Sequence, residues 1–405
     1  MKNEFRFIDS WGVELPFGDF VDASCFLNGW AEIESLSQQG NLIWEMLNRN
    51  GEKKAKLSGT TLEQTKIKAK QKGSYFALDG WTKDLTILCT IMDWDDNLRR
   101  SVGIWSFPRQ EWLAVPKYSY ASLRYTDKGF FPLLSPNGIL SHINFDGDNI
   151  HTFQIPNFIV KHFGEIIINE DKDTSDTCII QELLPNKRSA ARTKFALLNV
   201  CTGDCYGWIK ALKMGIESEN KRYVVDETGT EIITDSYGIR LFRLPYQSNF
   251  NLNKYQVYPR PVLGGIETSI FFNSDRMSVP YWDEKGVRHF YLIDNNGEIV
   301  IPPGKFDSGI KVIGNKRILL CKNSNWALAD YDGTLITDFS YKLFSTKLMN
   351  NRIVMGKRMS KKKIMYGALD AEGKEVIPFE FACIASQIGV GSNAPFSDNA
   401  TLIRI

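Results

Sequence analysis

The chain lacks most of the residue patterns on which enzymes and membrane proteins depend. Its 405 residues include only four histidines, and no glycine-rich phosphate loop, Gly-x-Ser-x-Gly elbow or His-Glu-x-x-His pair occurs. No apolar run approaches the roughly 18 residues that a spanning helix needs, and the first residues form no apolar signal segment. These absences predict a protein that is not an enzyme, needs no cofactor and does not cross a membrane.

The chain also lacks a cysteine framework and a strong net charge. Its seven cysteines are odd in number and scattered, which is typical of a reducing compartment and predicts a cytoplasmic protein. The formal net charge is only +2, so no global field favours nucleic acid or a membrane surface. Hydrophobic residues make up 43% and charged residues 24%, a composition that folds in water around a sizeable core.

Two groups contain metal-binding residue types, but neither has the spacing of a metal site. Cys201 and Cys205 flank a predicted turn, and no second close pair of cysteines exists to complete a zinc site. The spacing of His142 and His151 is compatible with neighbouring strands, yet loop or surface histidines are the simpler interpretation. The sequence therefore predicts no metal site and no catalytic residue.

One short pattern recurs along the chain: an apolar strand that ends in Asp, two residues, Gly, and another apolar strand. The Asp side chain accepts hydrogen bonds from backbone N–H groups further along the turn, and Gly takes the left-handed conformation that closes a hairpin. Counting relaxed copies gives about 40 residues per unit, a period typical of propellers and solenoids. The clearest copies are Asp226–Gly229, Asp294–Gly297, Asp330–Gly333 and Asp370–Gly373, looser ones are Asp9–Gly12, Asn48–Gly51 and Ser135–Gly138, and degenerate ones are expected at Trp105–Trp112, Asn199–Gly203 and Asp283–Gly286.

This repeat predicts an all-β fold of hairpin or meander units, propeller-like in form. A β-solenoid or two smaller β modules remain alternatives, because the unit count exceeds the usual ~4–8 blades. We expect a single repeat domain over residues 1–405, with the best-kept repeats at 1–50 and 222–405 and a diverged middle at 51–221. Pairing of an N-terminal strand with a strand at 400–405 would remove exposed sheet edges.

Two segments resemble the bacterial WG-repeat (KWG-repeat) proteins. Residues 366–378 read Tyr-Gly-Ala-Leu-Asp-Ala-Glu-Gly-Lys-Glu-Val-Ile-Pro. This is close to the family unit, in which an aromatic-Gly pair precedes Asp-x-x-Gly and an Ile-Pro strand end. Residues 326–330 keep the Trp of that pair but replace its Gly by Ala. The chain thus resembles a diverged member, and the resemblance implies a β-repeat scaffold and carries no catalytic residue across.

Clustered basic residues are the main positive signal for a binding surface. The alternation of lysines from 66 to 72 predicts a strand with one basic face, and a second cluster lies on a predicted hairpin. Such clusters hold nucleic-acid phosphates, or they protect a strand edge from aggregation. The expected nucleic-acid or partner-binding residues are Lys66, Lys68, Lys70, Lys72, Lys357, Arg358, Lys361, Lys362 and Lys363.

Taken together, these features predict a non-enzymatic binding or scaffold module, a β platform that engages a partner protein. The family resemblance implies a bacterial multi-component system of the toxin–immunity or defence type. Two alternatives stay open: a nucleic-acid-binding repeat protein that uses the lysine clusters, and a hydrolase whose site no motif reveals. An exposed apolar or aromatic patch would favour the protein-binding interpretation.

Overall fold

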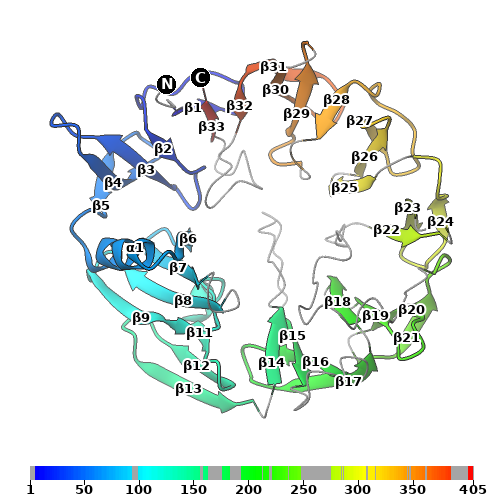
Figure 1. Ribbon diagram of the computed structural model, residues 1–405, viewed down its shortest axis with the longest axis horizontal. Helices are drawn as coiled ribbons and strands as arrows, with labels where there is room; N and C mark the ends of the chain where they lie inside the picture. Colours follow the sequence, from blue (N-terminus) through cyan, green and yellow to red (C-terminus); the bar gives the residue numbers. More distant parts are fainter. Residues whose placement is uncertain are drawn as a thin grey trace. The chain divides into compact units, whose positions relative to one another are not determined.

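The regular secondary structure of the described residues is almost entirely β, with consecutive strands paired as antiparallel meanders (Figure 1). The computed structural model describes residues 5–93, 99–155, 158–162, 176–182, 193–211, 213–218, 221–235, 237–247, 275–283, 285, 287–306, 309–314, 316–343, 345, 348–360, 363–384 and 400–404. Within these residues there is one α-helix, α1 (Thr61–Gln71), and one short 3₁₀ helix, η1 (Thr126–Lys128).

Four-stranded meanders recur along the chain. They are β2 (Asp22–Ala23), β3 (Trp30–Leu36), β4 (Leu42–Asn48) and β5 (Lys53–Lys56); β6 (Tyr75–Trp81), β7 (Thr86–Asp93), β8 (Arg99–Ser106) and β9 (Glu111–Tyr118); β10 (Tyr120–Ala121), β11 (Phe131–Leu134), β12 (Ile139–Ile143) and β13 (Asn149–Gln154); β14 (Phe158–His162), β15 (Thr177–Glu182), β16 (Thr193–Asn199) and β17 (Cys205–Ala211); and β18 (Lys213–Ser218), β19 (Lys221–Val225), β20 (Glu231–Asp235) and β21 (Arg240–Arg243).

The later strands follow the same antiparallel order. They are β22 (Arg276–Trp282), β23 (Arg288–Asp294) and β24 (Ile299–Ile301); β25 (Ile310–Gly314), β26 (Arg317–Lys322) and β27 (Asn325–Asp330); and β28 (Tyr341–Leu343), β29 (Ile353–Arg358), β30 (Ile364–Leu369) and β31 (Glu375–Phe381).

The chain divides into two compact units. Unit 1 comprises residues 1–135, 141–152 and 340–405, and unit 2 comprises residues 136–140 and 153–339. In unit 1, β1 (Phe5–Asp9) pairs with β33 (Ala400–Arg404), which also pairs with β32 (Cys383–Ile384) (Figure 1). The predicted pairing between the two ends of the chain is therefore confirmed. A single repeat domain over residues 1–405 stays a prediction.

Each unit buries its own apolar clusters between meanders. In unit 1, the indole of Trp81 is 1% exposed and donates its N–H to the Leu27 carbonyl at 2.7 Å, so one large ring joins two sheets. In unit 2, Tyr223 and Tyr291 are fully buried in one shared cluster. Alternating burial along strands such as β3 places every second side chain in these cores.

The Asp-x-x-Gly pattern is a turn device, as predicted. In the turn that begins at Asp294, Oδ1 accepts the N–H of Asn296 at 2.8 Å and that of Glu298 at 2.9 Å, and Gly297 has φ +87°. In other turns, too, the Oδ1 atom of the first residue accepts the backbone N–H groups of the residues two and four positions later. These first residues are Asp9, Asn48, Asn144, Asp226, Asp235, Asp283 and Asp370. The copies at Asn144 and Asp235 were not predicted.

The degenerate copies are also turns. Asn199 accepts the N–H of Cys201 at 2.8 Å and that of Thr202 at 3.2 Å, with Gly203 at φ +75°. Between β8 and β9 the left-handed position is held by Gln110 instead of glycine, with φ +57°. Turn chemistry therefore accounts for the recurrence of these carboxylates.

Replacing Gly297 with Ala is expected to destabilise unit 2 by about 2–4 kcal/mol, because a left-handed φ and overpacking act together. A Cβ there would lie 2.7 Å from Cδ2 of Phe242. Gly229→Ala is the matched control, since Gly229 has φ +85° but no heavy atom within 4 Å of the added Cβ. Urea unfolding of both variants measures the difference, and equal destabilisation would contradict the packing argument.

The lysine-rich stretch is helix α1, so the predicted strand with one basic face is wrong. Thr60 caps the helix by accepting the Glu63 N–H at 3.3 Å, and the Glu63 carboxylate accepts the Gly59 N–H at 2.7 Å. Leu62 and Ala69 are buried. Successive residues of a helix turn by about 100°, so lysines spaced by two spread around it. The capping residues Thr60 and Glu63 thus predict the helix correctly, whereas the alternation of lysines every two residues does not predict a strand here.

Candidate functional site

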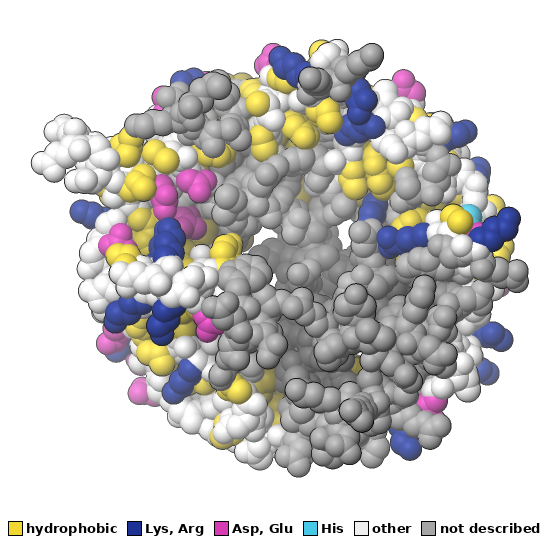
Figure 2. Space-filling view, in the orientation of Figure 1, with side chains coloured by type: hydrophobic (Ala, Val, Ile, Leu, Met, Phe, Trp, Pro, Cys, Tyr) yellow, Lys and Arg dark blue, Asp and Glu magenta, His cyan; other side chains and the backbone are white. Residues whose placement is uncertain are grey.

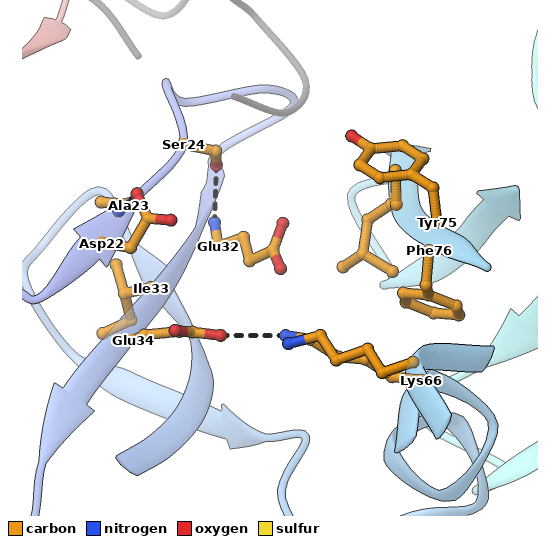
Figure 3. Close-up of a pocket in the computed structure, with 12 residues that line it drawn as sticks. Asp22, Ala23, Ser24, Glu32, Ile33, Glu34, Lys66, Tyr75 and Phe76 are labelled. Atoms are coloured by element: carbon orange, nitrogen blue, oxygen red, sulfur yellow. Dashed lines mark hydrogen bonds and ion pairs between the residues drawn. The ribbon is translucent and has the colours of Figure 1, made fainter. Parts of the chain in front are cut away.

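A pocket of about 210 Å³ lies in unit 1 among β2, β3, α1 and β6 (Figure 3). Acidic side chains come from the paired strands β2 and β3, lysines come from α1, and an aromatic wall comes from β6. Acidic and basic side chains adjoin over these elements in Figure 2. The lining residues are Asp22, Ala23, Ser24, Glu32, Ile33, Glu34, Lys66, Lys70, Tyr75, Phe76, Ala77 and Leu78.

Lys66 is engaged inside this pocket. Its Nζ lies 2.9 Å from Oε1 of Glu34 and 3.9 Å from the centroid of the Trp44 ring, and its side chain is 16% exposed. Trp44 in turn donates its indole N–H to Oε1 of Glu32 at 2.7 Å. The ion pair and the cation–π contact hold Lys66 in one place.

Burial raises the pKa of two carboxyl groups that line the pocket. For Glu32, the cost of removing the charge from water is partly offset by Lys66 and by the hydrogen bond from Trp44. Burial likewise raises the pKa of Asp22, and the hydrogen bond from the Ala23 N–H opposes this shift. Figure 3 shows the Glu32 carboxyl group directed into the pocket, across from Tyr75 and Phe76. Such a group can exchange a proton or attract a small cation.

The raised pKa of Glu32 makes stability depend on pH. Ionising this carboxyl costs free energy in the folded state, and the cost is complete above the folded-state pKa and absent below the unfolded value of about 4.3. We therefore expect Glu32→Gln to raise the urea midpoint at neutral pH, by a margin that shrinks as pH falls. Glu298→Gln, at an exposed turn, is the control for losing a charge. A margin that grew on acidification would contradict this assignment.

The predicted basic residues that the structure describes form two groups in unit 1, one on α1 and one where β29 ends and β30 begins (Figure 1). Lys68 and Lys70 lie in the last turn of α1, and Lys72 is its C-cap residue. Lys357 and Arg358 end β29, where the Lys357 Nζ lies 5.5 Å from the centroid of the Phe379 ring. Lys363 directly precedes β30. Lys361 and Lys362 lie outside the described residues.

The histidines and cysteines form no metal centre within the described ranges. His142 on β12 and His151 on β13 do lie on neighbouring strands, with ring centroids 6.0 Å apart. His142 is only 1% exposed and stacks on Phe130, so the expectation of a surface histidine is wrong there. Cys201 and Cys205 are both partly buried, and neither is in a disulfide. No group of three or more His, Cys, Asp or Glu side chains in the described part of the chain could hold a metal ion.

Two turns carry an exposed aromatic residue where equivalent turns are polar. We call residues 9–13, Asp-Ser-Trp-Gly-Val, the unit 1 tip, and residues 235–239, Asp-Ser-Tyr-Gly-Ile, the unit 2 tip. Trp11 is 67% and Tyr237 is 71% exposed, and the aliphatic residues that follow, Val13 and Ile239, are 60% and 65% exposed. In the other described turns with the same two bonds, the position of Trp11 and Tyr237 is held by Asn50, Asp146, Thr228, Lys285, Asn296 and Glu372.

A buried arginine supports each tip. In unit 2, the guanidinium of Arg222 is 1% exposed and donates from Nε to the Asp235 carbonyl at 2.9 Å and from Nη1 to the Gly207 carbonyl at 2.8 Å. In unit 1, Nε of Arg352 donates to the Ser10 carbonyl at 3.0 Å, and its guanidinium lies 4.7 Å from the centroid of the Trp11 ring. Burial lowers the pKa of Arg222, while the charge of Asp235 opposes that shift.

These contacts hold the backbone at Ser10 and at Asp235 in place. No sequence motif pointed to the tips. The signal that was available is the near-identity of the two pentapeptides, which differ only by Trp for Tyr and Val for Ile.

Comparisons with known proteins agree with this architecture. A crystal structure described as the eukaryotic initiation factor superposes with a TM-score of 0.53 at 9% identity, covering 93% of this chain and 95% of that one. The β-propeller domain of the trilobed protease from Pyrococcus furiosus gives a TM-score of 0.34 at 11% identity, covering 76% and 96%. Identities this low show the fold alone. The antiparallel meanders and the match at a TM-score of 0.53 together support an all-β, propeller-like repeat fold, as predicted.

The family comparison is narrower. A family model described as WG containing repeat matches residues 292–326, from the end of β23 to the start of β27. The chain thus carries a WG-containing repeat, which confirms the resemblance seen in the sequence. Comparison with curated proteins gives no match. Among the described residues, no helix has the length and apolar character to cross a membrane.

Proposed function

We propose that the chain is a non-enzymatic binding module that presents its aromatic tips to a partner protein. The observation that supports this is the exposure of Trp11 and Tyr237 at a turn position where equivalent turns hold polar residues. The turn bonds use only the backbone N–H of that residue, so the turn does not require an aromatic ring.

The residue types at the tips suit protein recognition. Trp, Tyr and Arg are the side chains most enriched among residues that carry binding energy at interfaces. An aromatic side chain that stays mostly in water contributes little to folding, but its apolar surface becomes favourable once a partner covers it. The fixed backbone beneath each ring reduces the conformational entropy lost on binding.

The cellular setting that we propose is a bacterial multi-component system of the toxin–immunity or defence type, with the chain in the cytoplasm. This part rests on the resemblance to WG-repeat proteins and on the scattered cysteines. A binding platform without catalytic residues would act there by holding another component in place.

The two alternatives have less support. For nucleic acid, helix α1 distributes its lysines around the axis, and Lys66 pairs with Glu34, which removes it from a phosphate-binding row. For hydrolysis, the raised pKa values of Asp22 and Glu32 favour acid–base chemistry in the pocket. Loss of a measured hydrolytic activity in Glu32→Gln, with the tips intact, would favour that alternative.

Quantitative capture from the native host tests the proposal. The bait carrying Trp11→Ser and Tyr237→Ser is compared with wild type and with a Val287→Ser control. Val287 occupies the same turn position as Ile239 and is 51% exposed. In its turn the position of Tyr237 is held by the polar Lys285. We expect a partner protein that wild type and control both retain and that the double variant loses by roughly 30-fold or more. Equal recovery on all three baits would overturn the proposal.

A further inference from the structure

We propose that the pocket of unit 1 binds a small organic ammonium ion, a primary amine carried on an apolar body. The juxtaposition that carries this inference is a cavity of about 210 Å³ with acidic side chains on one side and aromatic rings on the other (Figure 3). The inference goes beyond the proposed function, because it involves neither of the two tips.

Strands β2 and β3 place three carboxylates on one face of their sheet. Asp22 is the register partner of Glu34, and Glu32 lies two residues before Glu34, on the same face of β3. Like charges directly opposite each other destabilise a sheet. On the helix side of the pocket, Lys66 pairs with Glu34, and Lys70 is exposed. The ionised pocket residues therefore carry an excess of negative charge.

Two of these carboxylates have spare capacity to accept hydrogen bonds. Among the described residues, the Glu32 carboxylate accepts only the indole N–H of Trp44, at 2.7 Å, and the Asp22 carboxylate only the Ala23 N–H, at 2.9 Å. An ionised carboxylate has about four acceptor sites. Burial raises the pKa of Glu32, and the charge of Lys66 offsets this shift only in part. An ammonium ion would supply both the donors and the positive charge.

The opposite side of the pocket is aromatic. Tyr75 and Phe76 line it from β6, and the Glu32 carboxyl group is directed toward them (Figure 3). The Phe76 ring makes an edge-to-face contact with Trp44, with centroids 6.3 Å apart, which holds it in place. Aromatic rings attract a cation and also cover the apolar part of an organic ligand. The pocket therefore suits a cation that carries carbon.

The size and shape of the pocket favour an organic cation over other occupants. An apolar cavity of about 150 Å³ accommodates benzene, so the 210 Å³ of this pocket is enough for an amine on one ring or a short chain. Although three carboxylates line the pocket, no three His, Cys, Asp or Glu side chains of the described ranges are arranged to hold a metal ion. An anion would be repelled by Glu32.

Calorimetric titration of the full chain with phenethylammonium tests the inference. We expect saturable binding, with neutral phenethyl alcohol and anionic phenylacetate weaker by about tenfold or more. The indole N–H resonance of Trp44, which donates to Glu32, should shift in the complex. Absence of binding at millimolar concentration, equal affinity for the alcohol, or an unchanged Trp44 resonance would overturn the inference.

A free amine and a lysine side chain of another protein share this chemistry. A short blocked peptide with one lysine, compared with its norleucine counterpart, separates the two sources. Tighter binding of the lysine peptide than of phenethylammonium supports the ammonium site and assigns it to a protein ligand. Tighter binding of phenethylammonium supports it and assigns it to a free small molecule.

Point variants locate the binding in the pocket. Glu32→Gln keeps an oxygen that can accept the Trp44 N–H but removes the charge, so it should weaken phenethylammonium by about tenfold or more. The matched control is Glu45→Gln, because Glu45 is the register partner of Ile33 and lies on the other face of the same sheet. Equal affinity in the two variants would overturn the inference.

The tips provide a separate control. The double variant Trp11→Ser and Tyr237→Ser should bind phenethylammonium as wild type does, because neither residue lines the pocket. Failure of the ammonium site would therefore leave the proposed function standing, and failure of the tips to hold a partner would leave the ammonium site standing. Loss of phenethylammonium binding in this double variant would contradict the assignment to the pocket.

Discussion

Removal of residues 400–405 is expected to reduce the stability of unit 1 by more than about 4 kcal/mol, because it deletes a central strand and opens a core. Strand β33 pairs with β1 along Phe5↔Arg404 to Asp9↔Ala400 and with β32 on its other side. Its Thr401 and Ile403 are 0% and 3% exposed. Both neighbouring strands would be left with unpaired edges.

Hydrogen exchange measures this effect where it arises. Amides of β1 should lose most of their protection in the truncated chain. The control is Val13→Ser, which changes an exposed residue just after β1 and should leave that protection unchanged. Wild-type protection of β1 in the truncated chain would show that the pairing of the chain ends does not hold unit 1 together.

Arg222→Met is expected to lower the free energy of unfolding of unit 2 by about 2–3 kcal/mol, because two partly buried carbonyl groups lose their donors. These are the backbone oxygens of Asp235 and Gly207. The same variant should weaken partner binding through the unit 2 tip by about tenfold or more, since the turn is no longer fixed against β17.

Two further variants make the result specific. Arg222→Lys keeps the charge but cannot donate in both directions with the guanidinium geometry, so it should rescue stability only in part. Arg352→Met removes the corresponding support of the unit 1 tip and should leave unit 2 unchanged. Urea unfolding together with capture of the partner from the native host gives both readouts. Full stability in Arg222→Met would contradict the supporting role.

The sequence predicted the architecture because the turn chemistry is local. An Asp or Asn that accepts two backbone N–H groups, followed by a left-handed Gly, needs no distant residue, so the copy at Asp294 could be recognised by eye. Helix α1 was missed because alternating lysines imitate a strand, while the cap formed by Thr60 and Glu63 occupies only a few residues.

The candidate site was less accessible to sequence reasoning. The pocket brings Glu32 and Lys66 together from separate elements, a juxtaposition that only tertiary packing creates. The tips are different, since their signal was local: an aromatic residue inside a turn whose other copies are polar at that position. The Asp and Gly of each turn repeat, whereas the residue two positions after the Asp varies freely, so a repeat pattern built on Asp and Gly does not single it out.

Site-specific photo-crosslinking in the native host tests the central claim most directly. A photoreactive phenylalanine analogue is placed at Tyr237 and, as the matched position, at Thr228, which is exposed in the equivalent turn of the same sheet. The account predicts a discrete crosslinked protein from position 237 and none from position 228. The absence of a crosslink at 237, or the same product from both positions, would contradict it.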